Sequence, residues 1–241
     1  MKLPLLIISF IYLFLQSCSN DLDHKENSKV TIEEEFNKVQ IVDQFSNPLS
    51  KDTAFFMTIA EFFPLYIGQK IEQINLVYKP DEISSNRIEE WDLLKRPKQD
   101  SIILYIDSSR YVGVPMSIWE YHGTPEYRPS KIGYPVFIKN VSNEALELGF
   151  GNMLPLLIEA KDRQGNWNPI QKLFRYDCGT GLTVFYLKPE QIAITSMKVF
   201  QGNFRTHLRL VYGYKNDLKI YSNEIVGAIN ETQFNEDKMG L

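Results

Sequence analysis

Residues 206–214, "THLRLVYGY", alternate regularly along the chain. One set of alternate positions holds Thr206, Leu208, Leu210, Tyr212 and Tyr214, and the other holds His207, Arg209, Val211 and Gly213. Successive side chains of a strand point to opposite faces, so this alternation predicts a β-strand with one face buried. A chain with such a strand has to supply further strands that cover the buried face.

Six more short runs with strand character occur between residues 132 and 230. They are "GYPVFIKNV", "LPLLIEAKD", "NPIQKLFRY", "LTVFYLK", "AITSMKVF" and "KIYSNEIVG", separated by turn residues. Seven short strands in about 100 residues are typical of an immunoglobulin-like β-sandwich. The chain has only 2 cysteines and lacks the cysteine pair of antibody domains. We therefore expect a member of the wider sandwich class.

The part of the chain before the sandwich is expected to be smaller and mixed α/β or β-rich. Thr31 and Glu34 form a capping-box pattern for a helix, although the same stretch, 31–42, also has strand character. Residues 64–79 predict two strands around Gly68 and Gln69, 85–97 a short helix, and 101–109 a strand.

The N-terminal leader is short and ends at a cysteine. Its apolar run stops at residue 15, too short for a helix that spans a bilayer, which needs ~20 apolar residues. The run fits the apolar core of a secretory signal peptide. Leu15, Gln16, Ser17 and Cys18 resemble the lipobox of bacterial lipoproteins. The resemblance implies cleavage of signal peptide 1–17 and lipid attachment to Cys18, and the alternative is a plain signal with a chance cysteine.

The expected organisation follows from these features. We expect a lipidated tether at 18–50, a β-rich region with one short helix at 51–125, a β-sandwich at 126–234 and a tail at 235–241. The polar start of the tether includes Asp21 and Asp23, which resemble the acidic export signals of surface lipoproteins; a generic solvated linker explains them equally well. The expected location is the outer membrane, with the protein either surface-exposed or facing the periplasm.

Several stretches of the second half resemble a group of uncharacterised lipoproteins of Bacteroidetes-type bacteria. They are "YPVFIKN", "LIEAKDRQGNWNPI", "DCGTGL", "FRTHLRL" and "YSNEIVGAIN". The resemblance covers roughly 134–234 and implies an exported, lipid-anchored sandwich. It implies no activity.

Composition and motifs exclude several classes of function. The net charge of −4 gives no basic surface for nucleic acid. The three histidines, His24, His122 and His207, show no metal-ligand spacing, so we expect neither a metal site nor a cofactor. We expect His207 to lie beside Arg209 on the solvent face of its strand.

Two local motifs have both a chemical and a structural interpretation. Cys178 in "YDCGTGL" is a candidate nucleophile that lacks an evident base, and we interpret it as a buried free thiol at a strand end. The oxygen-rich 162–168 stretch, with Asp162, Asn166 and Asn168, could attract calcium. It lacks the complete calcium loop, and we interpret it as a hairpin turn with Trp167 covering the edge of the core.

The aromatic stretch 119–134 is the candidate binding segment. Trp119, Tyr121, His122 and Tyr127 crowd a region that glycine and proline keep out of regular structure. Such rings can stack on a glycan or pack against a protein ligand, or they can seal a joint between two regions. We expect a non-enzymatic binding, adhesion or envelope-assembly module whose partners are the membrane, through Cys18, and a glycan or protein ligand. The alternative is an extracytoplasmic enzyme that uses Cys178 or an unrecognised carboxylate pair.

Overall fold

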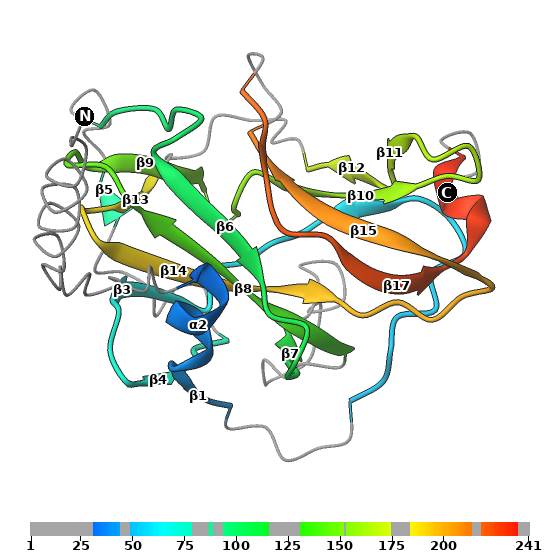
Figure 1. Cartoon of the computed structure of the whole chain (residues 1–241), viewed down its shortest axis with the longest axis horizontal. Helices are drawn as coiled ribbons and strands as arrows, with labels where there is room; N and C mark the ends of the chain where they lie inside the picture. The colour runs from blue at the N-terminus through cyan, green and yellow to red at the C-terminus, as the bar shows by residue number, and fades with distance from the viewer. Residues whose placement is uncertain are drawn as a thin grey trace, which may run out of the picture. The chain divides into compact units, whose positions relative to one another are not determined.

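Two five-stranded sheets face each other across one hydrophobic core in the computed structural model (Figure 1). The structure describes residues 31–43, 49–78, 87–88, 94–115, 131–151, 153–174, 184–213 and 218–235, with only the backbone of 87–88. These ranges belong to one unit, Ile32–Leu241, apart from Thr31. The mainly β, sandwich-like fold expected from the sequence is confirmed.

The first large sheet has the strand order β3-β14-β8-β6, and β7 also pairs with β8. Its strands are β3 (Tyr66–Gln69), β6 (Ile102–Ile106), β7 (Val112–Val114), β8 (Lys131–Asn140) and β14 (Gln191–Lys198). All of these pairs are antiparallel, with Ile194 opposite Phe137 at the centre. Strands from the expected N-terminal region therefore share a sheet with strands from the expected sandwich region.

The second large sheet has the order β11-β10-β15-β16, and β17 also pairs with β15. Its strands are β10 (Leu156–Lys161), β11 (Trp167–Pro169), β15 (Phe204–Tyr212), β16 (Ile220–Tyr221) and β17 (Ile225–Ile229). The register places Leu156 opposite Tyr212 and Ala160 opposite Leu208. The alternation is confirmed over 206–210, because Thr206, Leu208 and Leu210 are buried while His207 is exposed; it fails at Val211, which was expected on the face of His207 and is buried beside Tyr212.

Three smaller sheets complete the described elements. In the first, β1 (Gln40–Val42) pairs in parallel with β4 (Gln73–Asn75). In the second, β12 (Gln171–Leu173) pairs in parallel with β2 (Thr58–Ala60). The third is antiparallel, and β13 (Val184–Leu187) lies in it between β5 (Arg87–Ile88) and β9 (Leu146–Phe150). The helix expected over 85–97 is wrong at residues 87 and 88, because both pair with β13 as a strand.

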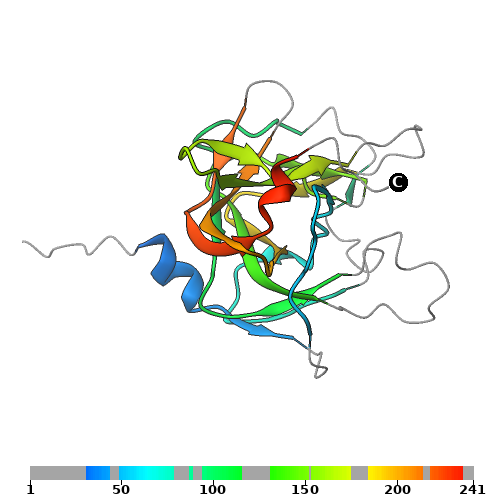
Figure 2. The ribbon, with the colours of Figure 1, turned by 90° about the vertical axis from the view of Figure 1, so that its right-hand side faces the viewer.

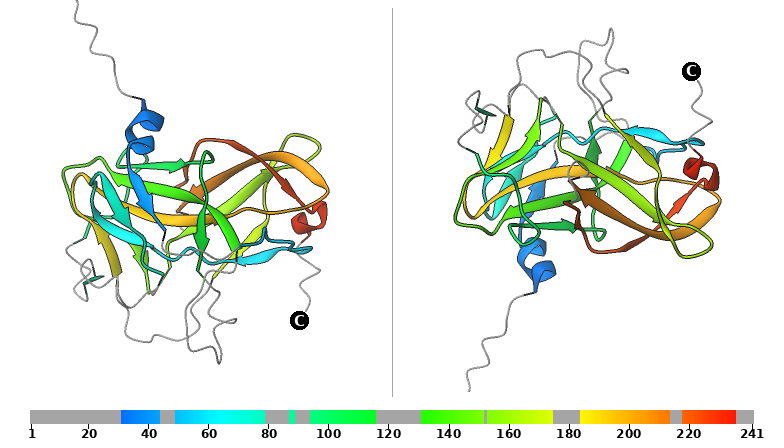
Figure 3. Two further views of the ribbon diagram at one scale, coloured as in Figure 1. Left: turned by 90° about the horizontal axis from the view of Figure 1, so that it is seen from below. Right: turned by 90° about the horizontal axis from the view of Figure 1, so that it is seen from above.

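The first large sheet is buried on both faces. Val136 and Ile138 of β8 enter the main core between the sheets, while Phe137 points to a second core on the opposite face. Helix α2 (Ile32–Asn37) covers that second core with Phe36 and lies over β8 and β14 (Figures 1 and 3). Burial of both faces explains why β8 has a nearly continuous apolar sequence rather than an alternating one.

The outer face of the second large sheet is covered by its own long side chains. The Arg209 guanidinium lies 4.1 Å from the Trp167 ring centroid and 3.9 Å from that of Tyr221. Arg209 also donates to Glu159 Oε2 from Nε at 2.9 Å and from a terminal nitrogen at 2.7 Å. Trp167 therefore packs on the outer face as part of a cation–π stack, rather than on the edge of the core.

Candidate functional site

The candidate site lies where the 49–56 segment crosses the end of the first large sheet. Ser50 accepts a backbone hydrogen bond from Ile132 at 2.9 Å, just inside the start of β8. Asp52 donates its backbone N–H to Val199 at 2.8 Å and accepts one from Gln201 at 2.7 Å, just past the end of β14. The segment therefore extends the sheet between β8 and β14.

The loop that follows is fastened to the C-terminal part of the chain. Asn230 donates its side-chain amide to the Ala54 carbonyl at 2.8 Å, and the Thr232 hydroxyl donates to the Phe55 carbonyl. Thr232 belongs to the 3₁₀ helix η3 (Glu231–Phe234), and Figure 2 shows the segment passing beside it. These bonds hold the backbone of residues 54–55 against residues that lie more than 170 positions later in the sequence.

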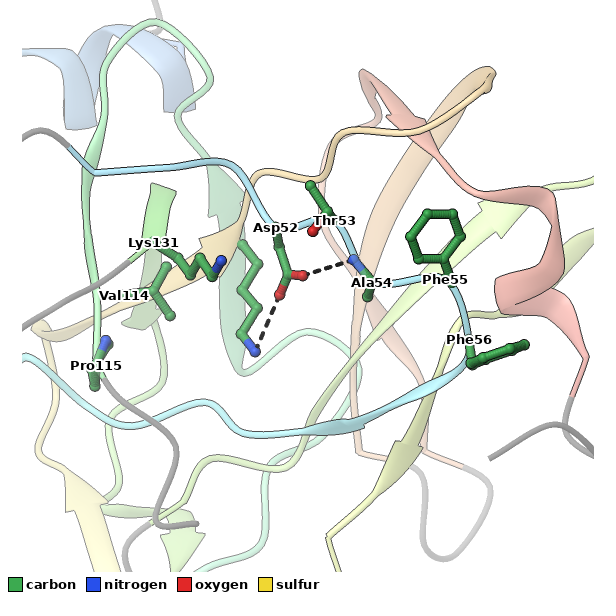
Figure 4. Close-up of a pocket in the computed structure, with 9 residues that line it drawn as sticks. Asp52, Thr53, Ala54, Phe55, Phe56, Val114, Pro115 and Lys131 are labelled. Carbon is green, nitrogen blue, oxygen red and sulfur yellow. Dashed lines mark hydrogen bonds and ion pairs between the residues drawn. The ribbon is translucent and has the colours of Figure 1, made fainter. Parts of the chain in front are cut away.

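A cavity of about 390 Å³ opens beside this segment (Figure 4). Its lining residues come from the 52–56 loop, the end of β7, the start of β8 and the end of β14: Asp52, Thr53, Ala54, Phe55, Phe56, Val114, Pro115, Lys131 and Lys198. In Figure 4, Val114, Pro115 and Lys131 lie on one side of Asp52, and Phe55 and Phe56 lie on the other. The volume is within the range of small-molecule sites.

The charges of the cavity do not cancel. Lys198 Nζ lies 3.5 Å from Asp52 Oδ2, and Asp52 Oδ1 also accepts the Ala54 N–H at 2.9 Å. Lys131 Nζ contacts the neutral Ser50 hydroxyl at 3.4 Å. Within the described ranges, Lys131 forms no ion pair with a carboxylate. The lining therefore holds two ammonium groups and one carboxylate, a net positive charge.

Two neighbouring phenylalanines of the lining are exposed. Phe55 has 65% of its surface exposed and Phe56 has 40%. The second Phe-Phe pair of the same apolar stretch, Phe62 and Phe63, is buried in contrast, with 2% and 3% exposed. Exposed large apolar side chains beside a cavity are typical of binding surfaces.

Among the residues that line the cavity, no nucleophile lies beside an unpaired base. Thr53 supplies its hydroxyl, and the neighbouring carboxylate of Asp52 is held by Lys198 and by a backbone N–H. A paired carboxylate of this kind is poorly placed to act as a general base. The geometry therefore suits recognition of a partly apolar ligand by contact and charge.

The residues that the sequence singled out as binding residues lie outside the described ranges. These are Trp119, Tyr121, His122 and Tyr127, and the same holds for the lipidation residue Cys18 and for Cys178. Pro115 and Lys131, which precede and follow the segment 116–130, both line the cavity. The binding role of the four residues stays a prediction.

The 162–168 stretch forms the hairpin turn that the sequence predicts. β10 and β11 pair across it, and Gly165 adopts a φ of +85°, which favours glycine. Desolvation opposes ionisation of Asp162, but hydrogen bonds from Asn166, Gln164 and Asn168 outweigh it and lower the pKa of the carboxyl. Because its oxygens accept these N–H groups, Asp162 acts as the centre of the turn.

His207 lies on the solvent face of β15, as predicted. Its side chain is 52% exposed, and Nδ1 lies 3.4 Å from Glu224 Oε2. Lys161 Nζ lies 3.0 Å from the same carboxylate oxygen. Across the placed residues, no group of three or more His, Cys, Asp or Glu side chains could hold a metal ion.

The residues of the cavity are not recognisable from the sequence. Asp52, Lys131 and Lys198 stand far apart in the sequence, and no local motif connects them. The one available signal was the pair of aromatic residues in "KDTAFFMT", which directly follows a charged and polar stretch. No local pattern distinguishes that pair from Phe62 and Phe63, which follow in the same apolar stretch.

The fold and the cavity define a mainly β, sandwich-like protein with a candidate binding site in the described part of the chain. No protein-family model matches this chain, and no curated protein has a significantly similar sequence. In the part of the chain that the structure describes, no helix has the length and apolar character needed to cross a membrane.

Proposed function

We propose that this protein is a lipid-anchored cell-envelope protein that acts as a non-enzymatic binding module. Its leader directs export and is removed, and lipid on Cys18 attaches the protein to the outer membrane, either on the cell surface or facing the periplasm. The tether at 18–50 holds the folded part away from the bilayer. The partner is a glycan or protein component of the envelope, recognised at the cavity beside Phe55 and Phe56.

The observation that carries the proposal is the exposure of Phe55 and Phe56 on a loop that is held in place. A loop free to move could bury these rings against the core and remove apolar area from water. Here Asn230 and Thr232 fix the backbone carbonyls of Ala54 and Phe55, so the rings stay at the surface. A rigid backbone that presents aromatic rings loses little conformational entropy on binding.

The anchoring part of the proposal is tested by changing Cys18. We expect Cys18→Ala to abolish incorporation of a fatty-acid analogue and to release the protein from the membrane fraction. One acyl chain binds a membrane only marginally, whereas two or more chains anchor a protein stably, so loss of the lipid site has a large effect. Persistent labelling of the variant would refute the lipid anchor.

The binding part is tested by capture of envelope components with the native lipoprotein. We expect Phe55→Ala and Phe56→Ala each to weaken capture about fivefold or more, the loss typical of an aromatic contact residue. Ile71→Ala is the matched control, because Ile71 is also apolar and 50% exposed but does not line the cavity. Equal capture by all three variants would show that the partner binds elsewhere.

A further inference from the structure

The cavity has a charge that the proposed function alone does not explain. The whole chain has a net charge of −4, yet the lining of this cavity is positive. Asp52 and Lys198 neutralise each other at 3.5 Å, and among the described residues the ammonium of Lys131 makes only a 3.4 Å contact to a neutral hydroxyl. An unpaired ammonium in a partly enclosed site favours a negatively charged group.

The apolar residues of the lining indicate that the remaining part of the ligand is apolar. Val114 and Pro115 are apolar and come from the end of β7 and the residue after it. Phe55 and Phe56 provide aromatic surface on the opposite side of Asp52 in Figure 4. The volume of about 390 Å³ accommodates an aromatic or short aliphatic group together with a charged group.

The position of Lys131 is fixed by the sheet. Lys131 starts β8, and β7 pairs with it through Val114. The 49–52 segment pairs on the same end of β8 through the bridge between Ser50 and Lys131. The side chain therefore emerges from backbone held on two sides, and Figure 4 shows it extending toward the Asp52 side of the cavity.

We infer that the cavity binds an organic carboxylate, with Lys131 contacting the carboxylate and the apolar part of the ligand lying against Phe55, Val114 and Pro115. The inference rests on the proposed binding function and names the chemistry of the ligand. A carboxylate matches in charge the ammonium of Lys131, which forms no ion pair within the described part of the chain. The carboxylate belongs either to a small organic acid or to the free C-terminus of a peptide chain.

The experiment compares probes that differ in charge but not in shape. Full-length protein in lipid nanodiscs is titrated with 3-phenylpropanoate and with neutral 3-phenylpropanamide, using ligand-observed NMR and empty nanodiscs as the blank. We expect the carboxylate to bind about fivefold more tightly than the amide, as for a charged contact open to solvent. Acetyl-Gly-Gly-Phe with a free or an amidated C-terminus repeats the comparison for a chain terminus.

Variants assign the preference to Lys131. Lys131→Gln should remove the preference for the carboxylate, and Lys131→Arg should retain it. Lys98→Gln is the matched control, because Lys98 is exposed and lies before β6, near the far end of β8. Tighter binding of the peptide acid assigns the carboxylate to a chain terminus, and tighter binding of phenylpropanoate assigns it to a small acid; both support the inference.

Three results would overturn the inference. They are equal affinity for acid and amide, a preference that survives Lys131→Gln, and no saturable binding of either acid. If acid and amide bind equally but both bind more weakly to Phe55→Ala than to the wild type, the carboxylate inference is overturned and the cavity is still a binding site. Failure of the proposed function is separate, because it requires that envelope capture be independent of Phe55 and Phe56.

Discussion

Arg209 shows at the scale of single residues how the outer face of the second large sheet is stabilised. Its guanidinium pairs with Glu159, whose side chain is only 10% exposed, and lies between the rings of Trp167 and Tyr221. We expect Arg209→Ala to lower the free energy of unfolding by about 3 kcal/mol, because it leaves a nearly buried carboxylate without its partner. Denaturant unfolding followed by tryptophan fluorescence and circular dichroism measures the change.

The double variant Arg209→Leu with Glu159→Leu separates the charge from the packing. We expect it to recover most of the lost stability, because no uncompensated charge remains. Exposed Arg205 on the same strand provides the control, and Arg205→Ala should change the free energy of unfolding by less than about 0.5 kcal/mol. A stability of Arg209→Ala equal to that of the control would contradict this account.

The two Phe-Phe pairs show what single residues do and do not predict. Phe55 and Phe56 have the same composition as Phe62 and Phe63, yet only the second pair is buried. The difference comes from bonds to Asn230 and Thr232, which no local pattern connects to residue 55. The alternation in β15 predicted the burial of Leu208 and Leu210 and the exposure of His207, because period-two burial is local, but it did not predict the burial of Val211. The candidate cavity was not predictable, because it depends on contacts between distant segments.

Helix α2 shows the corresponding limit for single elements. The sequence of 31–42 allowed a helix or a strand, and the structure contains both, α2 followed by β1. Phe36 is fully buried and stacks on Phe137 at 4.7 Å between ring centroids. Arg110 donates to the carbonyl of Phe36, near the end of the helix, and to that of Val39, just beyond it. These distant partners decide where the helix stops, because a helix of 6 residues is too short to be stable alone.

The contribution of α2 is measurable by removing its buried ring. We expect Phe36→Ala to lower the free energy of unfolding by about 3 kcal/mol, since truncation of a buried phenylalanine loses its burial and leaves a cavity. Ile32→Ala is the control on the same helix, because Ile32 is 45% exposed. Chemical denaturation measures both variants. A loss below about 1 kcal/mol for Phe36→Ala would show that the helix adds little to the fold.

The ion pairs of α2 predict a dependence on pH. Burial opposes ionisation of Glu35, but hydrogen bonds and charges from Lys70 at 2.7 Å and Lys139 at 3.0 Å outweigh it and lower the pKa of the carboxyl below 4.5. A lowered pKa in the folded state adds stability above the unfolded pKa, and this stability is lost as the pH falls through the folded pKa. We expect the stability difference between wild type and Glu35→Gln to be largest near pH 7 and to shrink below about 4.5.

The measurement is urea unfolding of both proteins between pH 7 and pH 3. Glu33→Gln on the same turn is the control, because in the described structure Glu33 forms no ion pair. A difference that stays constant over the whole range would show that the charge of Glu35 contributes nothing to the folded state.

At the scale of the whole molecule, the predicted and observed folds belong to the same class, but they differ in which strands pair within a sheet. The sequence predicted the mainly β sandwich because strand periodicity and turn spacing are local signals. β7 and β9 were missed, since each is short and has no clear alternation. Strand pairing is not local either: β3, β6 and β7 join β8 and β14, which follow them by up to about 125 residues.

One side chain joins the two large sheets where β6 approaches β16. Asn223 Oδ1 accepts the backbone N–H of Ile106 at 2.7 Å, and its Nδ2 donates to the Ile106 carbonyl at 3.0 Å. The amide group thus satisfies both backbone groups of the last residue of β6, as a neighbouring strand would do. Ser222, the preceding residue, donates its backbone N–H to Leu210 in β15 at 3.0 Å, so the link connects the first sheet directly to the second.

Loss of this link should loosen one edge of the sandwich before the whole fold. We expect Asn223→Ala to lower the free energy of unfolding by about 1 kcal/mol, the net value of a hydrogen-bonded pair that is partly open to water. Native-state hydrogen exchange should show faster exchange of the Ile106 amide. Asn223→Asp tests the geometry, because a carboxylate still accepts from the Ile106 N–H but cannot donate to its carbonyl. Asn203→Ala is the control, since among the described residues its side chain only accepts a long hydrogen bond, from the Glu231 backbone N–H at 3.4 Å. If exchange at Ile106 were equal in Asn223→Ala and the control, the two sheets would be held at this edge by apolar packing alone.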